Sequence, residues 1–283
     1  MLGHTGFIGS AIFEKFKRDN NLIVRGLSSS EVDLEKPRHL GRLMSVLNRQ
    51  TVLVVAIRSR NRDDTLQGFT SDIRMVVHLT QVLQAKAVRK CIYFSSASVY
   101  GHGETNLTVD ERTPVCPMSF YAAAKVTGEF LLGKIAQERG FPLLILRPCN
   151  VYGPGDKDPQ HGPARFIRSV LEGKPIALYG DGSERRDQLY VLDLGDIVHR
   201  LAFSEASGMY NLATGRSYSF REVLESLRRV IPEHFSVARI KRTRPKIDQQ
   251  FNVARLCREL SRSHFTDLEE GIRETYWAST RTS

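Results

Sequence analysis

The hydrophobic positions of this 283-residue chain form short apolar runs that alternate with segments of helical spacing. The run 51–57 (TVLVVAI) is continuously apolar and rich in β-branched residues, which is typical of a strand buried on both faces of a parallel sheet. Similar strands are predicted over 90–101, where a buried run ends in a polar turn, and over 142–148. A short strand over 21–27 and an extended piece over 32–34 precede them.

Segments with helical periodicity separate these strands. The first follows a glycine-rich turn and places Ile8, Ile12 and Phe16 on one helical face. Two more helices are predicted over 73–86 and over 121–139, the latter closed by a glycine. Strands that alternate with helices in this way predict an α/β fold with a doubly wound parallel sheet.

The pattern changes after the last of these strands. Residues 150–166 (NVYGPGDKDPQHGPARF) are rich in glycine, proline and charge, and they predict a loop that leaves the sheet. The apolar run 208–213 (GMYNLA) predicts a return to the sheet. We therefore expect a smaller, interrupted second domain.

Composition and charge narrow the class of protein. The chain is 41% hydrophobic and 25% charged, which is ordinary for a globular protein, and its net charge is +10. Such a charge suits nucleic acid, an anionic membrane or a phosphorylated small molecule, but aromatic residues do not alternate with arginine as in a base-stacking platform. The longest apolar run, 51–57, is far shorter than the roughly 20 residues of a membrane helix. We therefore expect no nucleic-acid partner and no membrane partner.

The cysteines bear on metal binding and on the cellular compartment. Cys91, Cys116, Cys149 and Cys257 are scattered and form neither a CxxC pair nor a cluster with metal-ligand spacing. The first residues also lack the charged-then-apolar layout of a signal peptide. We expect reduced thiols, no metal site and a cytoplasmic location.

Three glycines at the start of the chain carry the first candidate chemistry. Gly3, Gly6 and Gly9, in the stretch GHTGFIG, form a turn that opens a helix. Bare backbone and the positive end of a helix can hold a pyrophosphate. Such a turn normally follows a β-strand, whereas only Met1 and Leu2 precede it here. We therefore expect the natural protein to be a few residues longer, with a first strand that is truncated in this chain.

A tyrosine, a lysine and a group of serines carry the second candidate chemistry. Tyr121 and Lys125, in YAAAK, lie four residues apart and so share one face of a helix. A neighbouring cation favours the phenolate of a tyrosine, whose ordinary pKa is ~10. Ser95, Ser96 and Ser98 end a buried strand, where open α/β sheets present ligand-binding groups. A serine hydroxyl there can hydrogen-bond an oxygen that gains or loses a proton while the tyrosine moves that proton.

These motifs together resemble the extended short-chain dehydrogenase/reductase family, in particular its nucleotide-sugar epimerase/dehydratase branch. Matching blocks occur in order along essentially the whole chain: GHTGFIG, SSASVYG, YAAAK, RPCNVYGPG, YGDGSERRDQLYVLD, YNLATG and LEEGIRET. The resemblance implies a Rossmann-like NAD(P)-binding domain over 1–149 with a return segment at about 188–215. It also implies a substrate domain over 150–187 and 216–283 that binds a nucleotide-diphosphate sugar, and a homodimer.

The resemblance implies roles for individual residues. Tyr121 is the expected general base or acid, Lys125 its partner and a ligand of the nicotinamide ribose, and Ser96 the hydrogen-bond donor to the reacting oxygen. The expected cofactor contacts are Gly3, Gly6 and Gly9 with the backbone of Phe7 and Ile8 at the pyrophosphate, Asp33 and Leu34 by the adenine, Ala56 near the ribose, and Pro148 along the nicotinamide. The expected substrate contacts besides Ser96 are Asn150, Arg186 and Arg244 at the nucleotide diphosphate, because a planar guanidinium binds phosphate oxygens in pairs.

Three parts of the sequence depart from the family pattern. NAD sites usually carry an acid about 20 residues beyond the glycines, but the stretch VRGLSSS has Arg25 and hydroxyls instead, which favours NADP over NAD. Ala97 and Ser98 stand where 4,6-dehydratases carry an Asp-Glu pair, which argues against dehydration. Asp72 stands where the family generally has asparagine.

With dehydration disfavoured, two reactions of the family remain open. One is epimerisation through transient oxidation of a sugar carbon, and the other is net NADPH-dependent reduction of a keto-sugar. Both use the same three side chains, so the sequence leaves them open. A third hypothesis, of another class, is a family member that binds or senses the cofactor without catalysis, and the missing first strand motivates it. Intact SSASVYG and YAAAK motifs argue for an enzyme.

Overall fold

The computed structural model describes residues 1–59, 63–101, 106–157, 162–261 and 264–281. The chain forms two compact units. Unit 1 comprises Met1–Gly101, Glu111–Pro148 and Gly195–Asn211, and unit 2 comprises His102–Asp110, Cys149–Leu194 and Leu212–Ser283. The segment Glu111–Pro148 of unit 1 ends one residue before the end of the expected cofactor-binding domain at 149. The segment that returns to unit 1, Gly195–Asn211, is shorter than the expected 188–215.

Unit 1 is built on a parallel sheet. Its four strands lie in the order β1 (Val52–Val55), β2 (Lys90–Phe94), β4 (Leu143–Pro148) and β8 (Gly208–Leu212). Parallel pairing joins β1 to β2, with Leu53 opposite Cys91, and β2 to β4, with Ile92 opposite Leu144. The predicted α/β fold class is confirmed.

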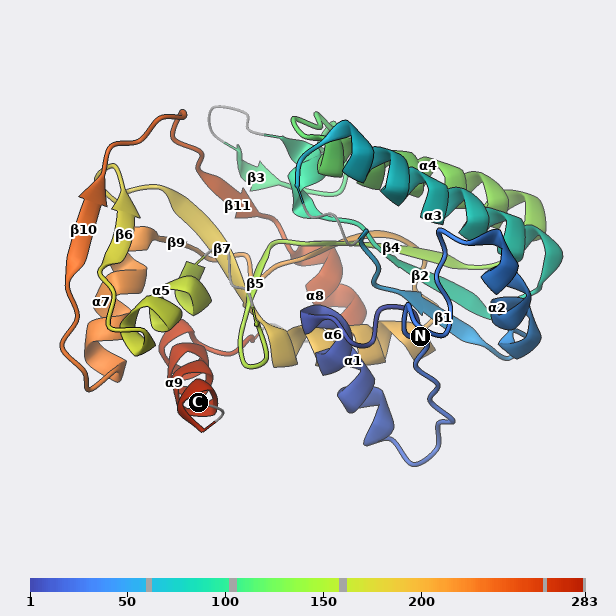
Figure 1. The fold of residues 1–283 in the computed structure, drawn as a ribbon, viewed down its shortest axis with the longest axis horizontal. Coiled ribbons are helices and arrows are strands. Elements are labelled where there is room, and N and C mark those ends of the chain that lie inside the picture. Colours follow the sequence, from blue (N-terminus) through green and yellow to red (C-terminus); the bar gives the residue numbers. More distant parts are fainter. Residues whose placement is uncertain (60–62, 102–105, 158–161, 262–263, 282–283) are drawn as a thin grey trace. The chain divides into compact units, whose positions relative to one another are not determined.

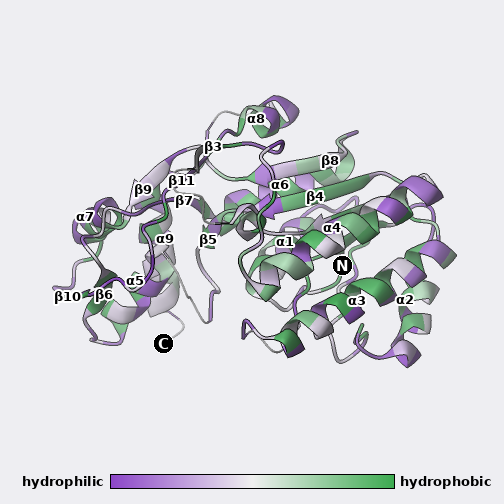
Figure 2. Ribbon diagram, turned by 90° about the horizontal axis from the view of Figure 1, so that it is seen from above, coloured by the Kyte–Doolittle hydropathy of each residue, from purple (hydrophilic) through white to green (hydrophobic). Residues whose placement is uncertain are grey.

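Helices cover both faces of this sheet. Figure 1 shows α3 (Leu66–Ala85) and α4 (Phe120–Arg139) along one face, and α1 (Phe7–Lys17) and α6 (Val191–Phe203) along the other. The shorter helices of unit 1 are η1 (Pro37–His39), α2 (Leu40–Val46) and η2 (Ala97–Tyr100). Strand β4 is largely hydrophobic along its length (Figure 2), and Leu79 and Leu132 from the two long helices are fully buried in the same core. The predicted apolar runs therefore form strands that are sandwiched between helices.

The start of the chain differs from the expected strands. Leu2 forms isolated parallel bridges to both Leu27 and Val55, and its amide donates to the carbonyl of Val54 over 2.8 Å. The predicted strand over 21–27 is wrong, because a strand pairs with a neighbour along its length and, of these residues, only Leu27 forms a β-bridge. The extended piece predicted over 32–34 also joins no sheet.

Unit 2 holds three small sheets and four helices among its described residues. The sheets are β5 (Asn150–Tyr152), β7 (Arg185–Tyr190) and β9 (Ser217–Ser219); β6 (Ile176–Tyr179) with β10 (Val237–Ile240); and β3 (Asn106–Val109) with β11 (Gln249–Phe251). The helices are α5 (Gly162–Leu171), α7 (Phe220–Val230), α8 (Ala254–Leu260) and α9 (Leu268–Thr280). A separate core fills this unit, with Ile167, Leu227 and Ile272 fully buried in it.

The loop predicted over 150–166 is wrong at both ends. Its first three residues form β5, which pairs in parallel with β7, and its last five begin α5. Residues 158–161 lie outside the described part of the chain. Among the residues that the structure describes, no helix combines the length and the apolar character needed to cross a membrane.

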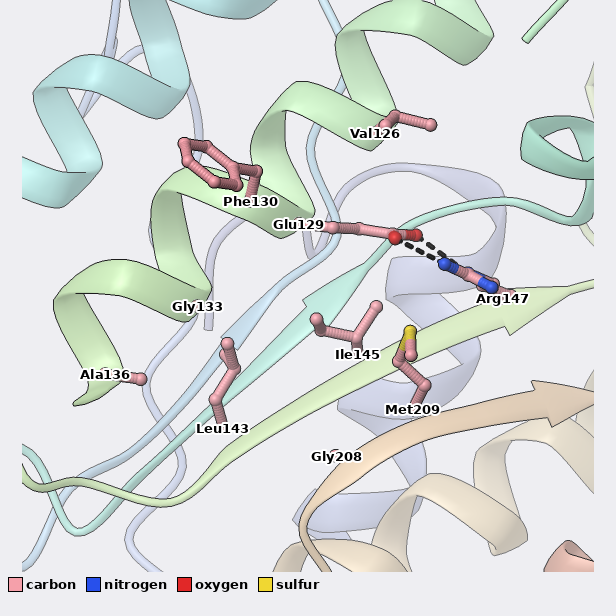
Figure 3. A pocket seen from close by; sticks show the side chains of 10 residues that line it. All are labelled: Val126, Glu129, Phe130, Gly133, Ala136, Leu143, Ile145, Arg147, Gly208 and Met209. Atoms are coloured by element: carbon pink, nitrogen blue, oxygen red, sulfur yellow. Dashed lines mark hydrogen bonds and ion pairs between the residues drawn. The ribbon is translucent and has the colours of Figure 1, made fainter. Parts of the chain in front are cut away.

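A buried ion pair fastens α4 to the sheet of unit 1 (Figure 3). Arg147 on β4 donates from Nε and Nη2 to the Glu129 carboxylate over 2.9 and 2.5 Å. The same carboxylate accepts from the Ser95 hydroxyl over 2.5 Å. Arg147 Nη1 donates to the Tyr100 hydroxyl over 2.9 Å, and that hydroxyl donates to Asn211 Oδ1 over 2.7 Å. One network therefore joins α4, β4, η2 and the ends of β2 and β8.

Removing one partner of this pair leaves the other charge buried. Arg147 is 3% exposed and Glu129 is 9% exposed, so we expect Arg147→Met to lower the free energy of unfolding by about 3–5 kcal/mol. The double variant Glu129→Leu/Arg147→Met is expected to be more stable than Arg147→Met, because it buries no lone charge. Urea unfolding of each variant measures both effects.

The exposed pair Arg168–Glu172 provides a control. Its atoms also lie 2.8 Å apart, but the arginine side chain is 47% exposed, so Arg168→Met should cost at most about 1 kcal/mol. If the double variant lost as much free energy of unfolding as the two single Glu129 and Arg147 variants together, the two residues would not form a coupled buried pair.

Candidate active site

At Gly3 and Gly9 the glycine turn brings backbone atoms too close together for a side chain, whereas a Cβ on Gly6 would make an ordinary contact. A Cβ on Gly3, whose φ is +82°, would lie 2.1 Å from the carbonyl oxygen of Ala56, and one on Gly9 would lie 1.9 Å from that of Gly3. Gly6 precedes α1 in an extended conformation and forms no side-chain cap. The first amides of α1, including those of Phe7 and Ile8, have no acceptor within the helix, and the first turn carries no acid. This arrangement fits the pyrophosphate of a dinucleotide.

The other expected cofactor residues lie on the same unit, and Ala56 contacts the turn itself. Ala56 follows β1 and its amide donates to the Leu2 carbonyl over 3.1 Å, while Pro148 is the buried last residue of β4. The Asp33 amide donates to His39 Nδ1 over 3.0 Å, and the buried Leu34 presents its carbonyl 2.5 Å from a ring nitrogen of His78.

The segment expected to face the adenine ribose contains an acid that the sequence analysis missed. Arg25 is exposed, and its carbonyl accepts from the Met1 ammonium over 2.6 Å. Glu31 accepts from the amide and the hydroxyl of Ser28, both over 2.9 Å, and these hydrogen bonds hold the pKa of its carboxyl below the ordinary value. Glu31 follows the serine run directly and lies 22 residues beyond Gly9, so the spacing of acids in NAD sites was a signal that could have found it.

Ser96, Tyr121 and Lys125 meet at the carboxyl ends of β1 and β2. Ser119 caps α4 by accepting from the Ala122 amide over 3.0 Å, which places Tyr121 in the first turn. Ser96 lies close enough to Tyr121 to affect ionisation of the phenol. Burial raises the pKa of Tyr121, while hydrogen bonding to Ser96 and the positive charge of Arg58 lower it.

Lys125 is anchored by the main chain. Its Nζ donates to the carbonyls of Phe94 and Ile57 over 2.8 and 3.1 Å, and lies 5.7 Å from the centre of the Tyr121 ring. Burial lowers the pKa of Lys125 to about 8, although the negative charge of Asp72 raises it. The lysine is therefore held beside the tyrosine by strand ends rather than by another side chain.

Two charged residues that the sequence did not single out for the site complete it. The Arg58 guanidinium carbon lies 4.5 Å from the centre of the Tyr121 ring. Asp72 on α3 accepts from the Ser59 amide over 2.7 Å and, with Lys125, lines a small cavity. Arg58 belongs to no periodic pattern, and its position three residues beyond β1 was the one available signal.

In unit 2, Arg186 and Arg244 lie near one another. Arg186 pairs with Glu184 over 2.7 Å and donates to the Ile247 carbonyl. Burial lowers the pKa of Arg186, Glu184 raises it, and the nearby Arg244 and Arg242 lower it further. Asn150 is the first residue of β5, opposite Gln188 in the neighbouring strand.

Arg244 lines a cavity of about 290 Å³ within unit 2. Arg165 and Arg242, which the sequence analysis missed, line the same cavity, together with aromatic residues Phe166, Tyr179 and Phe220. The Arg165 guanidinium lies 5.8 Å from the centre of the Tyr179 ring. Arginines beside aromatic faces form a site suited to an anionic ligand with a planar group.

Comparisons with known proteins agree with this arrangement. Residues 1–213 match the sequence profile of the NAD dependent epimerase/dehydratase family. UDP-glucose 4-epimerase of Mycolicibacterium smegmatis is 30% identical over 249 residues, which cover 78% of each protein. A trifunctional 4,6-dehydratase, 3,5-epimerase and reductase of Arabidopsis thaliana is 28% identical over 196 residues, covering 66% of this chain and 29% of that protein.

Among solved structures, the complex of Thermus thermophilus UDP-glucose 4-epimerase with NAD has a TM-score of 0.87 at 25% identity. The superposition covers 100% of this chain and 98% of that chain. The glycine turn, the parallel sheet and the sequence profile lead to one conclusion: this chain belongs to the NAD-dependent epimerase/dehydratase family.

Proposed function

We propose that this protein is an NAD(P)-dependent nucleotide-sugar epimerase or oxidoreductase that uses Ser96, Tyr121 and Lys125 at a sugar carbon. The observation that carries the proposal is the convergence of three side chains: Ser96 lies near enough to the Tyr121 phenol to lower its pKa, and Lys125 Nζ is fixed 5.7 Å from the centre of the Tyr121 ring. The three groups converge at strand ends of a parallel sheet, where ligands of such sheets bind. The glycine turn of the same unit fits the cofactor pyrophosphate.

The three side chains divide the proton chemistry among them. When bound, the nicotinamide cofactor accepts or returns a hydride at the reacting carbon. Tyr121 removes the proton of the hydroxyl on that carbon and returns it in the reverse direction, while Ser96 hydrogen-bonds the same oxygen. Lys125 adds positive charge near the phenol and offers its ammonium to the ribose.

Epimerisation and keto-sugar reduction are both compatible with these groups. No residue of η2 carries a carboxyl, and Ala97 there is buried, so we do not propose 4,6-dehydration. The exposed Arg25 suits the 2′-phosphate of NADP, which favours the reductase, whereas Glu31 nearby suits a free ribose hydroxyl. An epimerase leaves the total of reduced cofactor unchanged, whereas a reductase consumes one NADPH per turnover.

The substrate that we propose is a nucleotide-diphosphate sugar. Arg186 and Arg244 would bind the diphosphate with Asn150. Arg244 lines the arginine-lined cavity of unit 2, and Arg186 lies near enough to Arg244 for their charges to interact, whereas Asn150 and Arg186 do not line that cavity. The names of the relatives point to UDP-sugars. All four cysteines are free, which suits the reducing cytoplasm, where we place a homodimeric enzyme by family resemblance.

Replacing Tyr121 tests the catalytic assignment. Tyr121→Phe should lower kcat about 10²–10⁴-fold, because it removes the acid-base group, and should leave the Kd for NADPH or NADH nearly unchanged. The assay follows conversion of UDP-glucose and a panel of other nucleotide sugars, with cofactor binding measured by fluorescence. Tyr276→Phe, the same chemical change on α9 of unit 2, should retain turnover.

Two outcomes would contradict the proposal. Turnover of Tyr121→Phe equal to that of the unmodified protein would exclude Tyr121 as the acid-base group. Tight cofactor binding by the unmodified protein with no conversion of any sugar in the panel would favour the non-catalytic alternative.

Replacing Arg244 tests the nucleotide site. Arg244→Met should weaken binding of UDP about 10-fold or more, because charge-assisted hydrogen bonds contribute roughly 1.5–3 kcal/mol each. Isothermal titration calorimetry with UDP measures the change. Arg228→Met, on the exposed surface of α7, serves as the control for lost charge, and equal weakening in both variants would argue against the site.

A further inference from the structure

Two cations lie near the ring of Tyr121, and the nearer one is not the lysine of YAAAK. The Arg58 guanidinium carbon is 4.5 Å from the ring centre, whereas Lys125 Nζ is 5.7 Å from it. Lys125 directs its ammonium protons to the carbonyls of Phe94 and Ile57. Arg58 therefore places its positive charge over the aromatic face that becomes electron-rich when the phenol ionises.

The two cations also differ in how they respond to pH. Burial lowers the pKa of Lys125 to about 8, so its ammonium loses its proton in mildly alkaline solution. A guanidinium stays protonated throughout the range in which a tyrosine titrates. The guanidinium of Arg58, 4.5 Å from the ring centre, thus adds a positive charge beside Tyr121 to that of Lys125.

We propose that Arg58 is a positioning residue of the active site, whose guanidinium holds the Tyr121 ring and supplies the permanent positive charge that favours its phenolate. The inference rests on the proposed function, because the charge on Tyr121 matters to catalysis only if that phenol moves a proton. The YAAAK motif alone predicts that Lys125 is the cation that favours the phenolate. Part of this role then belongs to Arg58, which lies outside the motif.

Other groups that face Tyr121, besides Arg58, also affect the ionisation of its phenol. Ser96, after β2, lowers the pKa of the phenol, and Lys125 lies one turn along α4. Asp72 on α3 opposes ionisation through its negative charge. Asp64 accepts from the backbone amide of Tyr121 over 3.2 Å. The buried phenol of Tyr93 on β2 adds no charge at neutral pH, because burial keeps its pKa well above the ordinary value.

Asp72 also anchors the segment that carries Arg58. Its carboxylate accepts from the amide of Ser59, the next residue along the chain, over 2.7 Å. Ser59 is 3% exposed, so this contact fixes the backbone beside Arg58 against α3. The acid that disfavours the phenolate by its charge therefore helps to keep the favourable guanidinium in place.

The test measures ionisation of Tyr121 directly. The full chain is labelled with [¹³Cζ]tyrosine and titrated by NMR, and the Tyr121 signal is the one missing from Tyr121→Phe. We expect the pKa of the Tyr121 phenol to rise by about one pH unit in Arg58→Met, as is typical when an opposite charge nearby is removed. Arg58→Lys should raise it less, because a cation remains.

Two further variants keep the test decisive. Arg58→Gln is neutral and polar and should give the same rise, so it replaces Arg58→Met if that variant does not fold by circular dichroism. Arg49→Met removes an exposed arginine from the turn before β1 and should leave the Tyr121 titration unchanged.

An unchanged Tyr121 pKa in folded Arg58→Met or Arg58→Gln overturns the inference, as does an equal rise in Arg49→Met. The titration uses neither substrate nor cofactor. Its outcome is therefore independent of the turnover of Tyr121→Phe, and failure of the Arg58 inference can be told apart from failure of the proposed function.

Discussion

The buried pairing of Glu129 with Arg147 is the constraint on which the candidate site depends. Tyr121, Lys125 and Glu129 follow one another at intervals of four along α4 and so share a helical face. Arg147 fixes that face against β4, and Ser95, next to Ser96, donates to the same carboxylate. One carboxylate thereby sets where the tyrosine and the lysine stand relative to the serine. Buried ion pairs add little net stability, and we infer that this one serves geometry instead.

Charge within the site is balanced by groups from separate elements. Asp72 comes from α3, Arg58 from the segment after β1, and Lys125 from α4. Lys125 is buried, whereas Asp72 is half-buried and Arg58 is exposed, so water screens the charge of Arg58 more than that of Lys125. The protonation of Tyr121 therefore depends on how closely the three elements pack, and the packing in turn depends on the apolar core beneath them.

Much of the fold and the centre of the site could be predicted from sequence. Continuous apolar runs predict strands because burial on both faces leaves few positions for polar residues, and β2 and β4 formed where expected. The glycine spacing and YAAAK located the turn and the helix because short-range geometry determines both.

The predictions from sequence that were wrong or missed share a physical origin, because they concern contacts between residues far apart in sequence. A strand over 21–27 requires a neighbouring strand, and Leu2 pairs only with Leu27 of this segment through an isolated bridge. Strand β5 forms because Asn150 meets β7, which the glycine-rich composition around it does not indicate. Arg58 and Arg242 likewise reach their sites through tertiary packing, which no local pattern encodes.

The anchoring of Lys125 by main-chain carbonyls has an evolutionary consequence. Every residue at positions 57 and 94 would offer the same carbonyl, so substitutions there cannot delete the acceptors as they could delete a carboxylate. The lysine can keep its place while the side chains around it drift. Such tolerance helps to explain how a fold with a TM-score of 0.87 persists at 25% identity.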